Sequence, residues 1–542
     1  MRAVDLYSGI GGWSLGLRLA GVEVVASYEW WQPAIDTHNG NHDGNLSAVD
    51  IRRLELQDLP SDIDLVVGSP PCTEFSYSNR GGKGNLSEGM KDLVKFLEVV
   101  EHLKPRYWAL ENVPRVAEVL ERGFKDPEHV LHRFNKLQPQ IKIIDFSDYG
   151  APQSRKRCIA GNIPFDLIED YRPLLPRKTL GDVIRAVAAK DIVEDPVWGT
   201  LLPASALTEM QTEAALNGEE LRMNREAKTY HPVYNNMAFP DALDVPARTV
   251  TATCTRVSRE SIVISDPIVP NSFRRLTIRE RACLQGFPIT YQFYGKSFAE
   301  KAKMIGNAIP PTFTYLIASA ALGTTPKALQ PLNLVGSKLA LPTKVAPVTP
   351  PDNEGRSYPA KRSFRAALPG LRFKSGMRFD LSNQINEQGV SWHVRFFFGP
   401  SKDIREVELD GSVINDLRQD LESKAFSSFR NSLMLSEIKF NQTSPNSLQE
   451  RWTRRAVGLS PFDIVDTLGD LAKELTNLLE ATMANKAMAA AFVKQVAAGS
   501  ESIDQVPGLK KLERYAIPVL AGFIIGDWFN TLEWHHPHRV AA

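Results

Sequence analysis

The sequence predicts an α/β protein that begins with a mostly parallel sheet covered by helices on both faces and ends in an α+β region. Three observations lead to this prediction. Short apolar runs alternate with helical patterns in residues 1–165, which is typical of a parallel sheet. The first of these runs leads directly into a glycine-rich turn. From residue 361 onward, strand patterns come first and long helical patterns follow.

Length and composition bound the class of protein. A chain of 542 residues predicts two to four domains. With 64 basic residues, 63 acidic residues and 43% hydrophobic residues, the chain has a net charge of +1 and an ordinary globular composition. This composition excludes a wholly disordered, collagen-like or membrane-embedded protein. Four cysteines, no signal-peptide pattern and no apolar span of about 20 residues favour a cytoplasmic protein with no membrane partner.

Six apolar runs in the first 165 residues are predicted to be strands. Helical patterns between them are clearest at Lys91–Leu103 and Val116–Leu137. The rhythm is lost in residues 166–245, and a helical pattern returns from Thr277. The predicted strands are Ala3–Leu6, Val22–Tyr28, Ile63–Gly68, Tyr107–Glu111, Ile141–Phe146 and Cys158–Ile163.

These patterns divide the chain into five segments. Residues 326–360 hold seven prolines with little periodicity, which favours an extended spacer over a packed element. The segments are a core at 1–165, a small inserted domain at 166–270, a return to the core at 271–325, the Pro-rich linker at 326–360 and a separate α+β domain at 361–542.

The glycine turn and two following acids indicate a nucleoside-like ligand. Gly9 and Gly11 let the backbone turn tightly and approach a ligand closely. Glu29 follows the second predicted strand, where a carboxylate binds ribose hydroxyls in a doubly wound fold. Asp50 stands where a third strand would end and can accept from an adenine amine. Each acid alone is typical of a solvated surface, but in this order they predict a nucleoside cofactor.

Cys72 follows a rigid turn at the end of a predicted strand. In Ser69-Pro70-Pro71-Cys72 two prolines fix the backbone before the thiol, at the strand end where ligands bind in open α/β sheets. A buried cysteine is usually inert packing, but this placement favours a nucleophile. The next strand ends in Glu111, whose carboxyl can face the thiol. Residues 73–85, rich in Ser and Gly, suit either a loop that closes over a substrate or an ordinary surface loop.

Arg155 and Arg157 alternate in sequence, so on a strand they share one face. Two guanidiniums aimed at one place indicate a phosphate or a base carbonyl as their partner. A basic strand edge is the plainer alternative.

Six short motifs resemble those of the cytosine-5 DNA methyltransferase family of the bacterial and phage type. They are DLYSGIGG, SPPC, ENV, QSRKR, PARTVT at 246–251 and IGNAIPP at 305–311. Each motif alone is weak, but the set stands in unpermuted family order, which is very specific. The resemblance implies a Rossmann-like S-adenosylmethionine-dependent methyltransferase sheet and a small target-recognition domain. It also implies methyl transfer to carbon 5 of cytosine in DNA.

The resemblance gives a role to four catalytic candidates. Cys72 matches the nucleophile whose thiolate adds to carbon 6, so that carbon 5 can attack the sulfonium methyl group. Glu111 matches the acid that binds and protonates ring nitrogen 3. Arg155 and Arg157 match the basic pair near the flipped base and its phosphate, and residues 73–90 match the loop that closes behind that base.

The resemblance also implies S-adenosylmethionine as the cofactor and a set of residues around it. Tyr7 stands where the family often has Phe, Glu29 would contact the ribose, and Trp30 can stack on the adenine. Asn307 matches the late motif that closes the methionine end. The remaining implied contacts are Gly9 and Gly11 in the turn, Asp50 and Ile51 at the adenine, and Pro70 near the thiol.

Other reactive side chains receive no catalytic role. Three cysteines are expected to pack as small apolar residues, and three histidines near the C-terminus are spaced poorly for a closed site, so no metal is predicted. Arg248, in PARTVT, is expected to organise the recognition domain. The cysteines are Cys158, Cys254 and Cys283, and the histidines are His535, His536 and His538.

Residues after about 330 have no counterpart in a minimal member of this family. Residues 338–378 hold nine Lys or Arg against two acids, which is typical of a solvated linker or of an arm that contacts DNA. Two hypotheses therefore stand for 361–542: added DNA contacts, or a protein-interaction or regulatory domain.

Double-stranded DNA is the expected partner, bound by a monomer. A cognate restriction endonuclease fits the same context, although the sequence leaves its existence open. Two alternatives remain: an RNA cytosine-5 methyltransferase, which no feature favours over DNA, and a catalytically silent DNA-binding relative, against which the intact catalytic candidates argue. An exocyclic-amine methyltransferase is disfavoured because SPPC replaces its Asn/Asp-Pro-Pro-aromatic motif.

Overall fold

The chain divides into two compact units, one within residues 1–353 and the other within residues 354–542. Among the described residues, no helix is long and apolar enough to cross a membrane. The computed structural model describes residues 1–42, 44–71, 86–229, 237–253, 255–351, 357–373, 376–399, 404–407, 424–482, 486–498 and 512–532.

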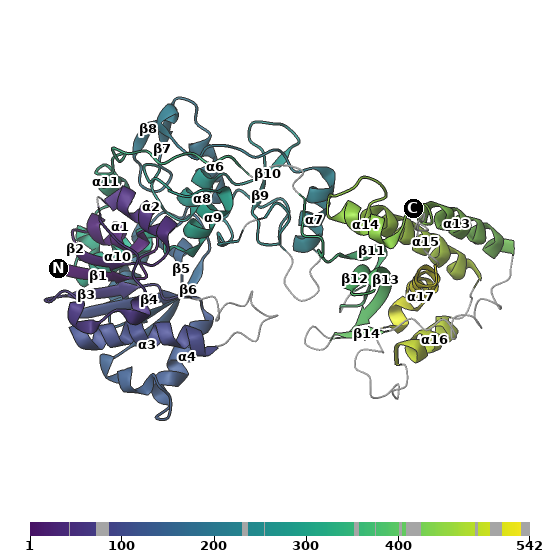
Figure 1. Ribbon diagram of the computed structural model, residues 1–542, viewed down its shortest axis with the longest axis horizontal. Coiled ribbons are helices and arrows are strands. Elements are labelled where there is room, and N and C mark those ends of the chain that lie inside the picture. Colours follow the sequence, from purple (N-terminus) through teal and green to yellow (C-terminus); the bar gives the residue numbers. More distant parts are fainter. Residues whose placement is uncertain are drawn as a thin grey trace, which may run out of the picture. The chain divides into compact units, whose positions relative to one another are not determined.

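A six-stranded sheet in the order β2-β1-β3-β4-β6-β5 forms the centre of the first unit (Figure 1). Strands β2, β1, β3 and β4 run parallel, and β6 runs antiparallel to both of its neighbours. The six predicted strands are therefore confirmed, and the sheet is mostly parallel as expected. The bounds are β1 Arg2–Leu6, β2 Glu23–Tyr28, β3 Leu65–Gly68, β4 Tyr107–Asn112, β5 Gln140–Asp145 and β6 Lys156–Gly161.

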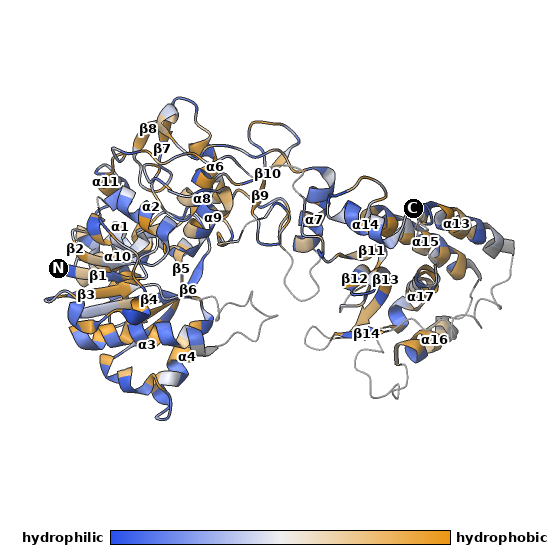
Figure 2. Cartoon of the chain, in the orientation of Figure 1, coloured by the Kyte–Doolittle hydropathy of each residue, from blue (hydrophilic) through white to orange (hydrophobic). Residues whose placement is uncertain are grey.

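Helices cover both faces of this sheet because its strands are apolar on both sides. Leu65 and Val67 of β3 belong to the core on one face, and Val66 belongs to the core on the other. Helices α1 and α10 contribute to the first core, and α3 and α4 to the second (Figure 1). Helix α5 also contributes to the first core. Figure 2 shows both hydrophilic and hydrophobic residues along α3 and α4, as expected of half-exposed helices. The bounds are α1 Gly12–Leu19, α3 Leu86–Leu103, α4 Arg115–Lys125, α5 Phe165–Tyr171 and α10 Pro311–Ala321.

The single helix predicted at Val116–Leu137 is wrong. It is interrupted after α4, and a 3-10 helix follows at His132–Leu137. Asp126 adopts an extended backbone conformation at the end of α4. The cause is Pro127, because a proline disfavours helical geometry in the residue before it.

The described part of the predicted inserted domain, 166–270, does not form a unit of its own. Ile168, Tyr171 and Trp198 are buried in the core on one face of the sheet. Val183 and Ile184 of α6 share a third core, separate from the two on the faces of the sheet, with α8 and α9. These apolar side chains complete the layers around the sheet, which a solvated insertion would not do. The remaining helices and strands of the first unit are α2 Gln32–His42, α6 Leu180–Val187, β7 Ile192–Glu194, β8 Leu201–Pro203, α7 Gly218–Thr229, β9 Val263–Ser265, β10 Phe273–Arg275, α8 Ile278–Leu284 and α9 Phe298–Asn307.

The predicted Pro-rich spacer is packed over much of its length, so this expectation is wrong for its described first part. Leu332 and Val335 of α11 (Leu332–Gly336) lie in the same core as Trp198. A Cβ on Gly336 would lie only 1.9 Å from the Trp198 carbonyl oxygen, so the backbones are in close contact.

Further along, polar groups hold the same segment through its backbone. The Lys301 ammonium donates to the Pro347 carbonyl at 2.7 Å, and the Tyr294 hydroxyl donates to the Lys344 carbonyl at 2.9 Å. Proline has no N–H, but carbonyl oxygens along such a segment remain good acceptors for buried donors. We call residues 332–349 the strap.

The second unit contains a four-stranded antiparallel sheet in the order β11-β12-β13-β14, with helices after it in sequence. Rings of Phe379, Phe396 and Phe523 meet in its core. The described part of 361–542 thus has strands first and helices after them. The elements are β11 Arg365–Arg372, β12 Arg378–Asn386, β13 Gly389–Phe398, β14 Arg405–Val407, α13 Lys424–Phe440, α14 Pro445–Trp452, α15 Pro461–Thr482, α16 Lys486–Ala498 and α17 Ala516–Asn530.

Leu332→Ala is expected to destabilise the first unit by about 2 to 5 kcal/mol, because it removes a buried side chain and leaves a cavity. Leu334→Ala in the same helix is the control, since Leu334 is 59% exposed. Urea unfolding of the full chain, followed by tryptophan fluorescence, measures both effects. Equal small effects would mean that the strap is only a linker.

Candidate active site

Residues in the left-handed backbone region form the turn after β1. Tyr7, Gly9 and Gly11 have φ angles of 54°, 55° and 89°, a region that favours glycine. A Cβ on Gly11 would lie 2.5 Å from Nε2 of His42, so a larger residue does not fit. A Cβ on Gly9 would meet no atom within 4 Å, so the backbone there borders open space. The two predicted glycines thus make a tight turn with one open side.

Glu29 ties the end of β2 to this turn. Its carboxylate accepts the Gly9 N–H at 2.9 Å, the Trp30 N–H at 2.9 Å and the Trp31 N–H at 2.8 Å. Two carboxylate oxygens offer about four acceptor positions, so one remains for a further donor. The adjacent Trp30 is 64% exposed, which leaves its ring face available to a ligand.

The strand predicted to end near Asp50 is wrong. An isolated bridge forms at Ala48, and Ile51–Arg53 form a 3-10 helix. The Asp50 carboxylate accepts the Arg52 N–H at 3.1 Å and so begins that helix. Such a local bond competes with strand pairing. Asp50 stays exposed, whereas Ile51 is buried in the core.

The ends of β3 and β4 are linked directly. The Asn112 side-chain amide donates to the Pro70 carbonyl at 3.1 Å, and the Trp13 indole donates to the Ser69 hydroxyl at 3.0 Å. Cys72 and residues 73–85 of the predicted closing loop lie outside the described residues. Residues 86–90 of that loop are instead the first turn of α3.

Glu111 and Arg157 form an ion pair at the same sheet edge. Nε of Arg157 lies 3.0 Å from Oε1 of Glu111, and the side chains are 14% and 6% exposed. A charge-assisted bond of this kind is stronger than a neutral one and holds the carboxyl in one orientation. The pair leaves Oε2 of Glu111 for another group.

Arg155 does not join this pair, so the prediction that the two guanidiniums meet at one place is wrong. Arg155 is buried and donates to the Val250 carbonyl at 3.1 Å and to the Gly306 carbonyl at 3.0 Å. The physical reason is that β6 begins at Lys156, so the alternation of a strand does not extend to Arg155. Arg155 therefore joins PARTVT to the segment that contains Asn307.

The predicted residue Asn307 is exposed at the end of α9, while its neighbour Gly306 is tightly packed. A Cβ on Gly306 would lie 2.3 Å from the carbonyl carbon of Thr251. Gln153, quoted only as part of a motif, accepts the Val250 N–H at 2.9 Å and donates to the Leu284 carbonyl at 2.9 Å. Three motifs far apart in sequence are thus bound together.

Asp92 of α3 belongs to none of the sequence motifs, yet it joins two of the predicted cofactor segments. It accepts the Tyr7 hydroxyl at 3.2 Å, Nε of Arg52 at 2.9 Å and Nη2 of Arg52 at 2.7 Å. Burial and the Asp92 carboxylate raise the pKa of Tyr7, so its hydroxyl remains a donor. The available signal was the Tyr7 hydroxyl itself, where the related family often has Phe.

A second buried polar chain lies beneath the glycine turn. Ser14 donates to Asp5 at 2.7 Å and contacts Nε2 of His38 at 3.1 Å, and Nε2 of His42 lies 3.0 Å from the Tyr291 hydroxyl. Burial lowers the pKa of His38 to about 3, lowers that of His42 and raises that of Asp5 to about 7. The four-residue spacing of the histidines on α2 was the only sequence signal.

Other predicted residues have structural surroundings. Cys158 and Cys283 are buried, and burial raises the pKa of Cys158 to about 12, so these two are confirmed as packing residues. Arg248 pairs with Asp241 at 2.6 Å and donates to the Ser261 carbonyl at 2.9 Å, as expected of an organising residue. Cys254 and the three histidines near the C-terminus lie outside the part of the chain that the structure describes.

The first part of the chain is similar to known DNA methyltransferases. The family model for C-5 cytosine-specific DNA methylases matches residues 1–322. Similar proteins include the Type II methyltransferases M.FnuDI of Fusobacterium nucleatum and M.NgoPII of Neisseria gonorrhoeae, at 27% and 26% identity. Each match covers 59% of this chain, with 93% and 95% of the respective relative. M.HindV of Haemophilus influenzae is 28% identical over 59% of this chain and 96% of its own length.

His38→Asn is expected to reduce the loss of stability in acid. Because the folded pKa of about 3 lies below the ordinary 6.5, the unfolded chain takes up this proton first. The stability that neutral His38 contributes is fully present above about pH 6.5. It is lost as the pH falls from there toward the folded pKa, by about 1.4 kcal/mol per pH unit. Urea unfolding between pH 4.5 and 7.5 measures the difference between variant and wild type.

The exposed His102→Asn is the control for this measurement. Asp5, with its raised pKa, contributes a slope of opposite sign that both proteins share. Parallel stability curves for wild type and His38→Asn would contradict the assignment of His38 as a buried neutral group.

Proposed function

The chain belongs to the C-5 cytosine-specific DNA methylase family and is a DNA cytosine-5 methyltransferase, and we propose that Cys72 and Glu111 carry its chemistry with S-adenosylmethionine as the methyl donor. One observation supports these roles of Cys72 and Glu111 more than any other. The Glu111–Arg157 pair and the Asn112–Pro70 bond lie at one edge of the sheet, and Pro70 stands two residues before Cys72 along the chain.

Carbon 5 of cytosine is a poor nucleophile until the ring is activated. The Cys72 thiolate adds to carbon 6, while Glu111 binds and protonates ring nitrogen 3, which prevents charge from accumulating on the ring. Carbon 5 then takes the methyl group. Loss of the carbon 5 proton to solvent with expulsion of the thiolate, and return of the proton on ring nitrogen 3 to Glu111, restore the neutral aromatic ring and the starting enzyme. The cytosine must leave the duplex for this chemistry, because carbon 6 is inaccessible within the stack.

Arg157 and Arg155 have different roles in this proposal. Arg157 touches Glu111 and holds its carboxyl in position for ring nitrogen 3. Arg155 is a positioning residue, because both carbonyls that it binds belong to other motifs of the site.

The residues at the glycine turn fit S-adenosylmethionine. Gly9 borders open space, the Ser8 hydroxyl is buried without a partner among the described residues, and Glu29 keeps an acceptor position for a ribose hydroxyl. When bound, this cofactor supplies an electrophilic methyl group on sulfur. Trp30 offers a ring face to the adenine. The other proposed contacts are Tyr7, Gly11, Asp50, Ile51, Pro70 and Asn307.

The biological setting is also a proposal. We place the catalytic core at 1–165 and 271–325, target recognition within 166–270 and a further domain at 361–542. The relatives are named Type II methyltransferases, which supports a restriction-modification or DNA-protection role in the cytoplasm and, as a partner, a cognate endonuclease. The enzyme acts on double-stranded DNA as a monomer.

Cys72→Ser is expected to abolish a covalent adduct with duplex DNA that contains 5-fluorocytosine. With S-adenosylmethionine present the wild type is trapped, because fluorine at carbon 5 cannot leave as a proton does. Denaturing gel electrophoresis detects the adduct, and Cys283→Ala is the matched cysteine control. Adduct formation by the serine variant would contradict the assignment of Cys72 as the nucleophile. Normal adduct formation by Glu111→Gln would contradict the assignment of Glu111 as the acid.

Glu29→Gln is expected to weaken S-adenosylmethionine binding about tenfold or more, which corresponds to about 1.4 kcal/mol. The amide replaces one acceptor oxygen with a donor facing backbone N–H groups. Titration calorimetry measures the Kd directly, without DNA. Asp36→Asn is the control, because Asp36 is an exposed carboxylate on the neighbouring α2. An unchanged Kd in Glu29→Gln would contradict the ribose assignment.

A further inference from the structure

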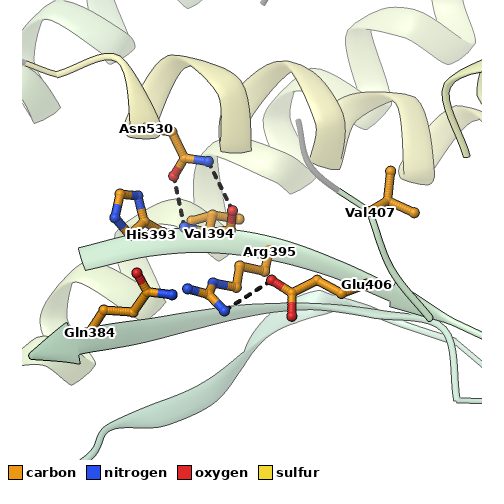
Figure 3. Close-up of a pocket in the computed structure, with 7 residues that line it drawn as sticks. All are labelled: Gln384, His393, Val394, Arg395, Glu406, Val407 and Asn530. Carbon is orange, nitrogen blue, oxygen red and sulfur yellow. Dashed lines mark hydrogen bonds and ion pairs between the residues drawn. The ribbon is translucent and has the colours of Figure 1, made fainter. Parts of the chain in front are cut away.

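Clusters of polar side chains occur in both units, and they differ in the segments that they hold. In the second unit, a pocket of about 360 Å³ is lined by Arg395, Glu406 and Asn530 among others (Figure 3). Arg395 of β13 pairs with Glu406 of β14 at 2.9 Å, and the Asn530 amide of α17 binds the β13 backbone. These groups hold a sheet to its own neighbours. In the first unit, a cluster centred on Asp92 instead holds two segments of the proposed cofactor site.

One side of α3 carries three charged residues that bind the short 3-10 helix next to the proposed adenine contacts. Glu88, Asp92 and Lys95 are spaced four and three residues apart, so they lie on one side of the helix. The Nη groups of Arg52 donate to Glu88 at 2.9 Å and to Asp92 at 2.7 Å. Nζ of Lys95 donates to the Leu54 carbonyl at 2.6 Å. The 3-10 helix is therefore held to α3 at two points.

Asp92 is the buried member of this set, with a side chain that is 6% exposed. Its two carboxylate oxygens accept Nε and Nη2 of Arg52 at 2.9 Å and 2.7 Å, a two-point pairing that fixes the geometry of both groups. Oδ1 of Asp92 also accepts the Tyr7 hydroxyl at 3.2 Å. Because Arg52 and Glu88 are both more than one-third exposed, water weakens their pair, and Asp92 provides the stronger link.

Tyr7 needs an anchor of this kind because of its backbone. Its φ of 54° lies in the left-handed region, which is unfavourable for a bulky side chain. A residue stays in such a conformation only where its surroundings hold it. The Tyr7 ring packs in the same core as Ile51 and Leu93, and its hydroxyl is bound by Asp92. Asp92 thus fixes the far end of the side chain whose backbone begins the glycine turn.

We propose that Asp92 and Arg52 are positioning residues that hold Tyr7 and the turn at Ile51 in the arrangement that binds S-adenosylmethionine. The inference rests on the proposed function, because it takes these two segments as parts of the cofactor site. The pair acts through Tyr7 and Ile51, so it sets the affinity for the cofactor and not the methyl-transfer step.

The size of the effect follows from pre-organisation. A site that is competent for only part of the time binds with an apparent Kd that is raised by the inverse of that fraction. Loss of the pair frees Tyr7 to leave its unfavourable conformation. If the competent arrangement is then populated about one-tenth of the time, the Kd rises about tenfold.

The test measures the Kd of the full chain for S-adenosylmethionine by titration calorimetry without DNA. Asp92→Asn keeps the size of the side chain but removes the charge that pairs with Arg52, and we expect the Kd to rise about tenfold. Tyr7→Phe removes only the hydroxyl and should raise the Kd about threefold. The double variant should stay near the Kd of Asp92→Asn and below the product of about thirtyfold, because both changes break one linked set of bonds.

Glu98→Gln is the matched control, because Glu98 is also an acid of α3 that pairs with an arginine, Arg133, at 2.7 Å. This change should leave the Kd within about twofold of the wild type. In steady-state methylation, the effect of Asp92→Asn should appear mainly in the KM for S-adenosylmethionine and much less in kcat. A general loss of folded protein would lower the activity without raising this KM.

Several outcomes would overturn the inference. They are an unchanged Kd in Asp92→Asn or in Tyr7→Phe, an equal rise in Glu98→Gln, and effects that multiply fully in the double variant. If Asp92→Asn does not fold, Tyr7→Phe decides, because it leaves the Asp92–Arg52 pair intact and removes one oxygen atom.

Failure of this inference and failure of the proposed function are distinguishable. If the wild type binds S-adenosylmethionine and traps 5-fluorocytosine DNA while the Asp92 and Tyr7 variants bind the cofactor equally well, only the positioning role fails. If the wild type does not bind S-adenosylmethionine, the proposed cofactor site fails, whatever the variants show.

Discussion

The parallel register of β1, β3 and β4 is the constraint on which the rest of the first unit depends. Leu6 pairs with Gly68, and Gly68 pairs with Leu110, so the three strands end level with one another. The glycine turn, the Pro70 segment and Glu111 must then emerge at one edge of the sheet. In open α/β sheets this edge is where ligands bind. The order of the motifs along the chain thus becomes proximity in space.

Buried hydrogen bonds hold the segments whose positions are not determined by the strand register alone. Arg155 reaches carbonyls 95 and 151 residues away, and Gln153 binds Val250 on the same stretch. Asp92 and the His38–His42 chain do the same beneath the glycine turn. A buried donor or acceptor that loses its partner costs about 1 to 3 kcal/mol, so these bonds select one arrangement of the motifs.

The two units differ in how their sheets are packed. In the first, the family match ends at residue 322, but packing continues through the strap, because Leu332 and Val335 complete the core around Trp198. The second unit packs α17 against one face of its antiparallel sheet. On the other face Phe397 and Asp380, both buried, hold Arg365 and Arg378 in place.

By itself the sequence determined the six strands, the motif order, the family and the identity of the residues at the strand ends, because apolar periodicity and turn chemistry are local. It also determined that Glu29 follows β2 and that Glu111 ends β4. The tertiary structure alone decided that Arg155 and Arg157 have different partners and that the Pro-rich segment packs as a strap. It also decided that Asp50 begins a 3-10 helix. These outcomes depend on which carbonyl groups and apolar surfaces are brought together by segments far apart in the sequence. No local sequence pattern encodes such long-range contacts.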